Sequence, residues 1–171
     1  MGVNLIFYIL IKMTQKEIEE IVTAISKHLD TVAITGSAAI LKQIPKWNHE
    51  VHDLDLYCLA TADNIQWLER MQQEHPSSWW HIKDKLFPNW VTTNKFDYHI
   101  NFMGQDIDVW CYKELTVFEV DNLWYVPLAT TLRAKLQISK GDPKHLKSID
   151  EILAAVQSYG VINYPLFKFS V

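Results

Sequence analysis

Two stretches of the chain carry the same unusual run of side chains. VHDLDLYC at 51–58 and QDIDVWCY at 105–112 both contain Asp, apolar, Asp, apolar, aromatic and Cys in that order. Because side chains alternate between the two faces of a β-strand, each stretch would place its two carboxylates on one face and its Cys on the other. Asp is disfavoured in strands, so the presence of four carboxylates on one face of a sheet needs an explanation.

The four carboxylates belong to Asp53, Asp55, Asp106 and Asp108. Same-face carboxylates can converge on one cation or bridge two metal ions about 3.5–4 Å apart. The ion we expect is Mg²⁺, because it prefers carboxylates, water and phosphate oxygens. The alternative is that one or both strands lie at a sheet edge, where Asp faces water and deters aggregation.

Two further features could bind an anion. Gly36-Ser37 joins the strand-like TVAITG to the helix-like SAAILKQI. Gly there permits close approach of a ligand to the backbone, and the first N–H groups of a helix attract negative charge. Residues 133–147 form a basic segment with five Lys and Arg side chains against one Asp. Lys135 and Lys144 are its candidate ligands for phosphate, and the alternative is a solvated basic surface.

Composition limits the classes of function. The formal net charge of −4 argues against binding to duplex DNA through many phosphate contacts. The apolar residues 3–11 are too few to span a bilayer, so we expect no membrane insertion and interpret 1–13 as an N-terminal extension or an extra strand. The two Cys residues fit buried apolar positions and a cytoplasmic location. A length of 171 residues predicts a single domain over 1–171.

The pattern of apolar and turn residues predicts the elements that would position these groups. Helices are expected over 15–29, 37–44 and 64–75, with Asp63 as the cap of the third, and over 127–141 and 142–160 near the C-terminus. Strands are expected over 31–36, 51–60, 96–103, 106–112, 116–120 and 123–126. Gly104-Gln105 would form the turn of a hairpin between 96–103 and the second Asp strand. The segment 77–95 is unassigned, and Trp79, Trp80 and Trp90 within it would form core or a wall facing a substrate.

Taken in order, five motifs resemble the nucleotidyltransferase superfamily typified by DNA polymerase beta, especially its small bacterial-type members. The motifs are AITGSAAIL, HDLDLYC, QDIDVW, VPLATTLRAKL and GDPKHLKSIDEIL. The resemblance spans roughly 31–156 and implies an α/β (α+β) nucleotidyltransferase fold. In that fold a mixed β-sheet carries the Asp motifs, helices flank it, and a helical segment over 127–160 follows.

The resemblance also implies roles for individual residues. Gly36 and Ser37 would hold the β- and γ-phosphates, and Lys135 with Lys144 would steady the triphosphate. The metal ligands would be Asp53, Asp55 and a third carboxylate, either Asp108 or Asp106. The chain departs from the usual pattern where sixteen residues separate Ser37 from Asp53, and where the expected Lys-Asp pair is Lys144-His145.

The implied reaction transfers a nucleoside monophosphate from a nucleoside triphosphate, with ATP the expected one, to an acceptor hydroxyl. Pyrophosphate leaves, and a pair of Mg²⁺ ions supports the transfer. The sequence leaves the acceptor open among a small molecule, a protein side chain and an RNA end. Two rival classes are a non-catalytic, binding or antitoxin-like protein of the same fold and a metal-dependent nuclease. No strand-borne Glu-x-Lys partner supports the nuclease.

Overall fold

A computed structural model describes residues 12–78, 97–138 and 143–171 of the chain. Its helices are α2 (Gln15–Ile25), α3 (Gly36–Gln43), α4 (Ala62–Glu74), α6 (Leu128–Ile138) and α7 (Pro143–Tyr159). Its strands are β1 (Val32–Thr35), β2 (Leu54–Leu59), β3 (Asp97–Phe102), β4 (Gln105–Tyr112), β5 (Glu114–Val120), β6 (Leu123–Tyr125) and β7 (Phe167–Ser170). The extension before Met13 falls almost entirely outside the described residues, as do Trp79, Trp80, Trp90 and the cap expected at Asp142.

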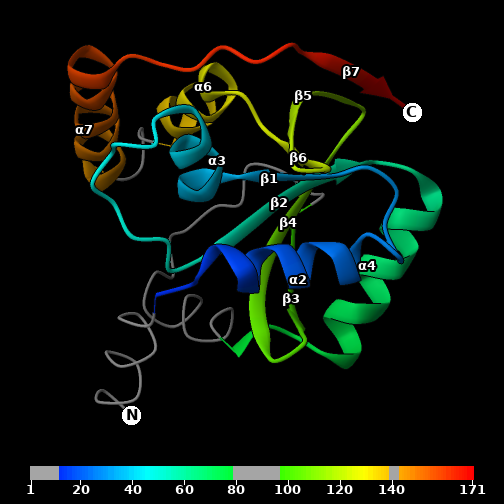
Figure 1. Ribbon diagram of the computed structural model, residues 1–171. Helices are drawn as coiled ribbons and strands as arrows, with labels where there is room; N and C mark the ends of the chain where they lie inside the picture. Colours follow the sequence, from blue (N-terminus) through cyan, green and yellow to red (C-terminus); the bar gives the residue numbers. More distant parts are fainter. Residues whose placement is uncertain (1–11, 79–96, 139–142) are drawn as a thin grey trace.

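The strands form one mixed sheet in the order β3-β4-β2-β1-β6-β5-β7 (Figure 1). β2 pairs with β4 in parallel and with β1 antiparallel, while β3 and β4 form the expected antiparallel hairpin. The α/β class with a mixed sheet is therefore confirmed. β7, which pairs with β5, was not predicted. No helix in the described part of the chain is long and apolar enough to cross a bilayer.

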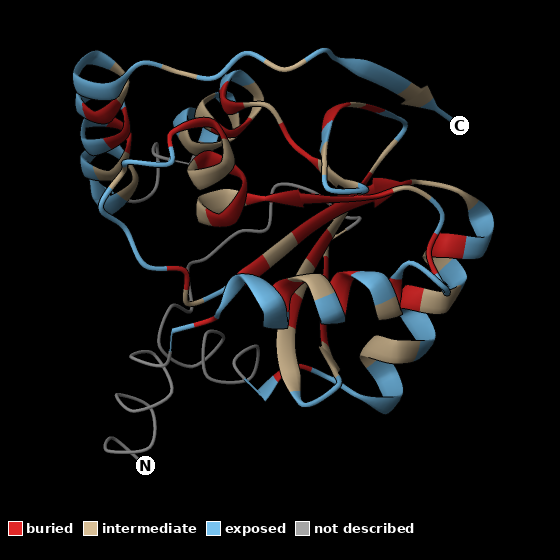
Figure 2. Ribbon diagram, viewed as in Figure 1, coloured by how far each residue is buried: buried red, intermediate tan, exposed pale blue. Residues whose placement is uncertain are grey.

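The two faces of the sheet bury different sets of side chains, and the interior is visible as the red parts of Figure 2. On one face the main core joins α2 and α4 to alternate residues of the central strands, among them Ile34, Leu56 and Val109. A smaller cluster on the other face includes Ala33, Tyr57, Val117 and Val126. The strands therefore alternate as expected, and the Asp residues do not belong to the main core.

A third apolar cluster fixes the C-terminal helices. Ile40 lies in α3, and Ile44 is the residue directly after that helix. Both pack with Leu128 of α6 and with Ile152 and Ala155 of α7. Gln43 ties the same region together, because its Oε1 accepts from the backbone N–H of Leu128 at 2.8 Å. The helices that carry Lys135 and Lys144 are thus held against the helix that begins at Gly36.

Two helix ends differ from the sequence prediction. α2 begins with the expected Thr14 capping box but ends at Ile25, four residues early. α4 is capped by Thr61, whose hydroxyl accepts from the N–H of Asn64, so the cap expected at Asp63 is wrong. Thr and Asp are both good N-caps, and only the local backbone decides between two that stand close together.

The hairpin turn is also shifted by one residue. Phe102 pairs with Gln105, so Met103 and Gly104 make the turn instead of Gly104-Gln105. Both have positive φ, 54° and 77°, as a tight turn matching the twist of the strands requires. Met103 is 62% exposed, so nothing packed against it opposes this backbone conformation.

Candidate functional site

The motifs singled out in the sequence meet at one end of the central strands. β1 and β2 are antiparallel, so β1 ends beside the start of β2. β4 is parallel to β2, so both Asp motifs begin at that same end. The strand directions therefore bring the Gly36-Ser37 turn, DLD at 53–55 and DID at 106–108 together.

Four side chains from four strands form a row across this end of the sheet, here called the aspartate row. Thr35 of β1 pairs with Asp55 of β2, Asp55 with Asp108 of β4, and Asp108 with His99 of β3. Directly paired residues on neighbouring strands share a face and lie near each other. Asp55 and Asp108 are both half-buried. The sheet thus holds two carboxylates side by side in a partly desolvated place.

Gly36 touches the aspartate row. A methyl group added at its Cα would lie 3.0 Å from Oδ2 of Asp55, closer than a carbon atom normally sits. Its φ is +69°, a left-handed conformation that suits Gly. Both facts require Gly at this position, because a larger residue would strain the backbone and press on the carboxylate.

Ser37 is the half-buried second residue of α3. The helix N-cap is Thr35, which makes no side-chain capping bond. Ser37 therefore lies inside the first turn, where helix N–H groups have no partner within the helix. This placement is compatible with the phosphate contact that the resemblance implies, and Ser37 is not the N-cap of the helix.

Lys135 of α6 belongs to the same region. Burial lowers the pKa of Lys135, the charge of Asp55 opposes that shift, and Lys144 adds to it. Asp55 and both lysines are therefore close enough for their charges to interact. Lys135 is half-buried and Lys144 is exposed at the start of α7. The basic segment thus contributes Lys135 near Asp55, with Lys144 near Lys135.

The remaining two carboxylates lie differently. Asp53 is exposed and precedes β2 by one residue, so it lies at the rim of the sheet. Asp106 is half-buried, and its Oδ1 accepts from Nδ2 of Asn101 at 2.9 Å and from the N–H of Ser78 at 3.3 Å. Of the two candidates for the third carboxylate, Asp108 is the one that pairs directly with Asp55.

His99 is the member of the row that the sequence analysis missed. Its Nδ1 lies 2.5 Å from Oδ1 of Asp108, and its side chain is only 4% exposed. The signal was present, because the predicted hairpin of 96–103 with 106–112 places alternate residues of both strands on one face. The register could not be read from the sequence, since the turn was placed one residue late.

Carboxylates that stand side by side suit Mg²⁺, whose other ligands are commonly waters and substrate phosphates. Asp55 and Asp108 provide such a pair, and Asp53 lies two residues before Asp55 along the chain. Among residues 12–78, 97–138 and 143–171, no group of three or more His, Cys, Asp or Glu is arranged to hold a metal ion. The fit to Mg²⁺ therefore rests on two adjacent carboxylates.

A further carboxylate belongs to the same face of the sheet. Asp97 pairs with Trp110 across β3 and β4, two residues from His99. Burial raises the pKa of Asp97 to about 6, with His99 and a hydrogen bond to Trp110 opposing the shift and Asp108 adding to it. Asp97 is thus electrostatically linked to the aspartate row, although the sequence analysis did not single it out.

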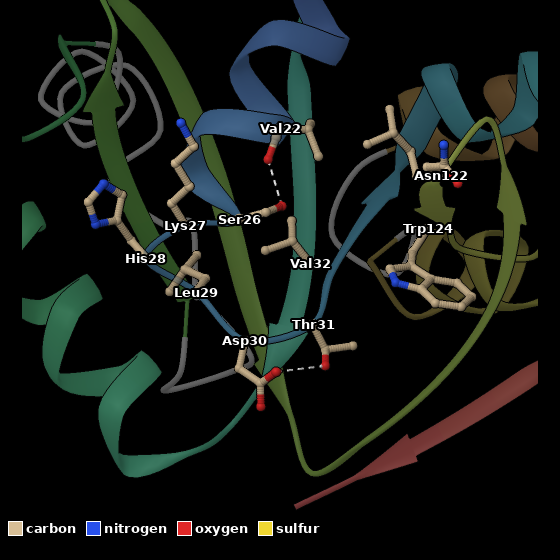
Figure 3. A pocket seen from close by; sticks show the side chains of 11 residues that line it. Val22, Ser26, Lys27, His28, Leu29, Asp30, Thr31, Val32, Asn122 and Trp124 are labelled. Atoms are coloured by element: carbon tan, nitrogen blue, oxygen red, sulfur yellow. Dashed lines mark hydrogen bonds between the residues drawn. The ribbon is translucent and has the colours of Figure 1, made fainter.

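One cavity lies away from the aspartate row. A cavity of about 460 Å³ is lined by Ser26, Lys27, Asp30, Asn122 and Trp124, among others (Figure 3). It surrounds the start of β1 at Val32, whereas the aspartate row includes the last residue of β1, Thr35. None of the predicted site residues lines it, so this cavity is not the expected triphosphate site.

Comparison with known proteins gives one distant structural likeness. A crystal structure of an antigenic nucleotidyltransferase-like protein from Paracoccidioides brasiliensis is 16% identical, with a TM-score of 0.49. The match covers 86% of this chain and 79% of that one. No protein-family model matches the chain, and no curated protein matches it significantly in sequence. A likeness of this size assigns neither family nor activity.

Proposed function

We propose that the protein is a metal-dependent nucleotidyltransferase that moves a nucleoside monophosphate from a nucleoside triphosphate to an acceptor hydroxyl. The observation that carries the proposal is the direct pairing of Asp55 with Asp108 beside Gly36, with the charge of Lys135 close by. These groups come from four separate parts of the chain. The alternative, Asp residues that face water at a sheet edge, fits less well, because neither β2 nor β4 is an edge strand.

The residues divide the work of binding and positioning. The N–H groups at Gly36 and Ser37 would bind the β- and γ-phosphates, and Lys135 and Lys144 would neutralise their charge. Asp53, Asp55 and Asp108 would hold Mg²⁺, and the ion would lower the pKa of the acceptor hydroxyl and offset the charge of the leaving pyrophosphate. Asp106, tied to Asn101, would support the β4 end of the site.

Asp108 would accept the hydrogen bond of the acceptor hydroxyl and orient it toward the α-phosphorus. The new bond would join the acceptor oxygen to that phosphorus, the hydroxyl proton would pass to Asp108, and the bond to the bridging oxygen would break to release pyrophosphate. Most of the rate gain in such a transfer comes from positioning and electrostatics. ATP is the first triphosphate to test, and the acceptor remains open among a small molecule, a protein side chain and an RNA end.

The test incubates the protein with Mg²⁺, α-labelled triphosphates and acceptors of the three kinds. We expect label to move to an acceptor with wild-type protein and not with Asp53→Asn plus Asp55→Asn. Thermal denaturation with ATP should show a stabilisation that requires Mg²⁺ and is absent from the double variant. Binding without transfer to any acceptor would favour the non-catalytic alternative, and an equal thermal shift in the double variant would show that the nucleotide binds elsewhere.

A further inference from the structure

His99 is held rigidly beside the third carboxylate of the aspartate row. Its backbone N–H donates to Oε1 of Gln72 at 2.7 Å, and its carbonyl accepts from the N–H of Ser77 at 3.1 Å. Its imidazole is buried, and Nδ1 meets Oδ1 of Asp108. An ionised carboxylate can only accept hydrogen bonds, so Nδ1 is the donor in this contact.

The direction of this contact matters because Asp108 lies on β4, which is flanked by β3 and β2. His99 approaches its carboxylate from β3, while Asp55 pairs with it from β2. The last torsion of an Asp side chain is broad and weakly restrained, so an unsupported carboxylate samples many orientations. A bond that fixes Oδ1 on the β3 side therefore restricts the orientation of the whole carboxylate, next to Asp55.

We propose that His99 is a positioning residue: it orients the Asp108 carboxylate so that Asp108 and Asp55 bind a divalent cation together. This inference rests on the proposed function, because it assumes a cation at the aspartate row. Groups that hydrogen-bond to metal ligands commonly set ligand orientation, and their loss weakens metal affinity by roughly 10–100-fold. No role as a proton carrier is needed, since His99 acts only through Asp108.

The test measures Mn²⁺ affinity directly, from the paramagnetic resonance signal of free Mn²⁺, with no acceptor present. His99→Asn keeps an N–H donor near the place of Nδ1 and should retain most of the affinity. His99→Leu removes the donor at similar size, so its affinity should fall by roughly 10–100-fold. Ile100→Val is the control, because Ile100 is the next residue of β3, on the opposite face and fully buried.

The outcomes separate this inference from the proposed function. If wild type binds Mn²⁺ and Asp55→Asn does not, but His99→Leu binds as wild type does, the positioning role is wrong and the proposed function stands. An affinity loss in Ile100→Val equal to that in His99→Leu would also overturn the role, because loosening β3 would then suffice. If wild type binds no Mn²⁺ with or without ATP, both proposals fail.

His99→Gln carries the test if His99→Leu is unfolded at the assay temperature. The Gln amide nitrogen reaches the place of Nε2 instead of Nδ1, so its Mn²⁺ affinity should be well below that of His99→Asn. Equal affinities in the Asn and Gln variants would contradict an orienting bond at Nδ1.

Discussion

Two residue pairs on the same two strands have opposite surroundings. Asp55 pairs with Asp108, and three residues further along Cys58 pairs with Cys111. The carboxylates lie on the face that receives Gly36 and Lys135, whereas both thiols are buried in the main core with Sγ atoms 3.4 Å apart. Contact with Cys111 and burial raise the pKa of the Cys58 thiol, which keeps it protonated. One strand pairing therefore supplies a polar site on one face and an inert core on the other.

This comparison separates binding from stability. Substitutions on the face of the carboxylates should change ligand affinity more than folding, and substitutions on the face of the thiols should do the reverse.

Lys135→Met should weaken triphosphate binding by about 1.5–3 kcal/mol, the range for a hydrogen bond to a charged group. Monophosphate binding should weaken less, because the β- and γ-phosphates carry most of the charge that Lys135 would neutralise. Stability should change little, since Met keeps the apolar stem. Calorimetric titration with ATP and AMP measures the difference, and Lys27→Met, at the distant cavity, is the control. Equal losses for both nucleotides would remove Lys135 from the triphosphate pocket.

Cys58→Ser should lower the free energy of unfolding by about 1–3 kcal/mol, because it buries a hydroxyl in an apolar core. Urea denaturation measures this change, and Cys58→Ala separates the effect of polarity from that of lost volume. Triphosphate affinity of the folded variant should match wild type. A matching loss of affinity would show that the two faces of β2 are not independent.

Gly36→Ala and Gly160→Ala form a matched pair. Both residues have positive φ, +69° and +74°, so each substitution should cost about 1–2 kcal/mol of stability. Only the methyl at Gly36 would press on Asp55, since nothing lies within 4 Å of one at Gly160. We therefore expect Mg²⁺-dependent ATP binding to weaken in the first variant alone, as measured by thermal shift. Unchanged binding in Gly36→Ala would mean that the Gly36 contact does not position Asp55.

Asp97 should make the fold less stable as pH rises from about 4 to about 6. Its pKa in the folded protein is raised to about 6, above the unfolded value near 4, so folding favours the protonated form. The raised pKa stabilises the fold at low pH, and that contribution disappears above pH 6. Because Asp97 is partly exposed, the effect should be only about 1 kcal/mol. Urea denaturation of wild type and Asp97→Asn from pH 4 to 7 tests it, and parallel pH profiles would contradict it.

Local patterns in the sequence were enough to predict most of the fold. Apolar periodicity gave the helices and the central strands, and the Thr14 capping box was correct. The β7 strand was not predicted because its residues are mostly exposed and its partner, β5, is far away in the chain. Caps also failed where two good candidates stood close together, as with Thr61 and Asp63.

The types of residue in the site could be predicted from the sequence, whereas their arrangement in space could be predicted only in part. The repeat of Asp and Cys predicted correctly that the carboxylates and the thiols lie on opposite faces of β2 and β4, because alternation is a property of a single strand. The choice between Asp106 and Asp108 depended on the register between β2 and β4, which no local pattern within either strand determines. His99 was missed for the same reason, since its role follows from what lies opposite it.

The pairing of β2 with β4 has a consequence for how the chain folds. A slip of one residue would turn Asp55 toward the main core and Leu56 toward the face of the aspartate row, because a strand's side chains change face with every step. Misaligned pairing would then bury charge without a partner, at a cost of several kcal/mol. The carboxylates proposed for chemistry thus also select the correct alignment of the sheet. Asp→Asn variants, which stay polar, can isolate their chemical role, whereas Asp→Leu variants would also remove the penalty against misalignment.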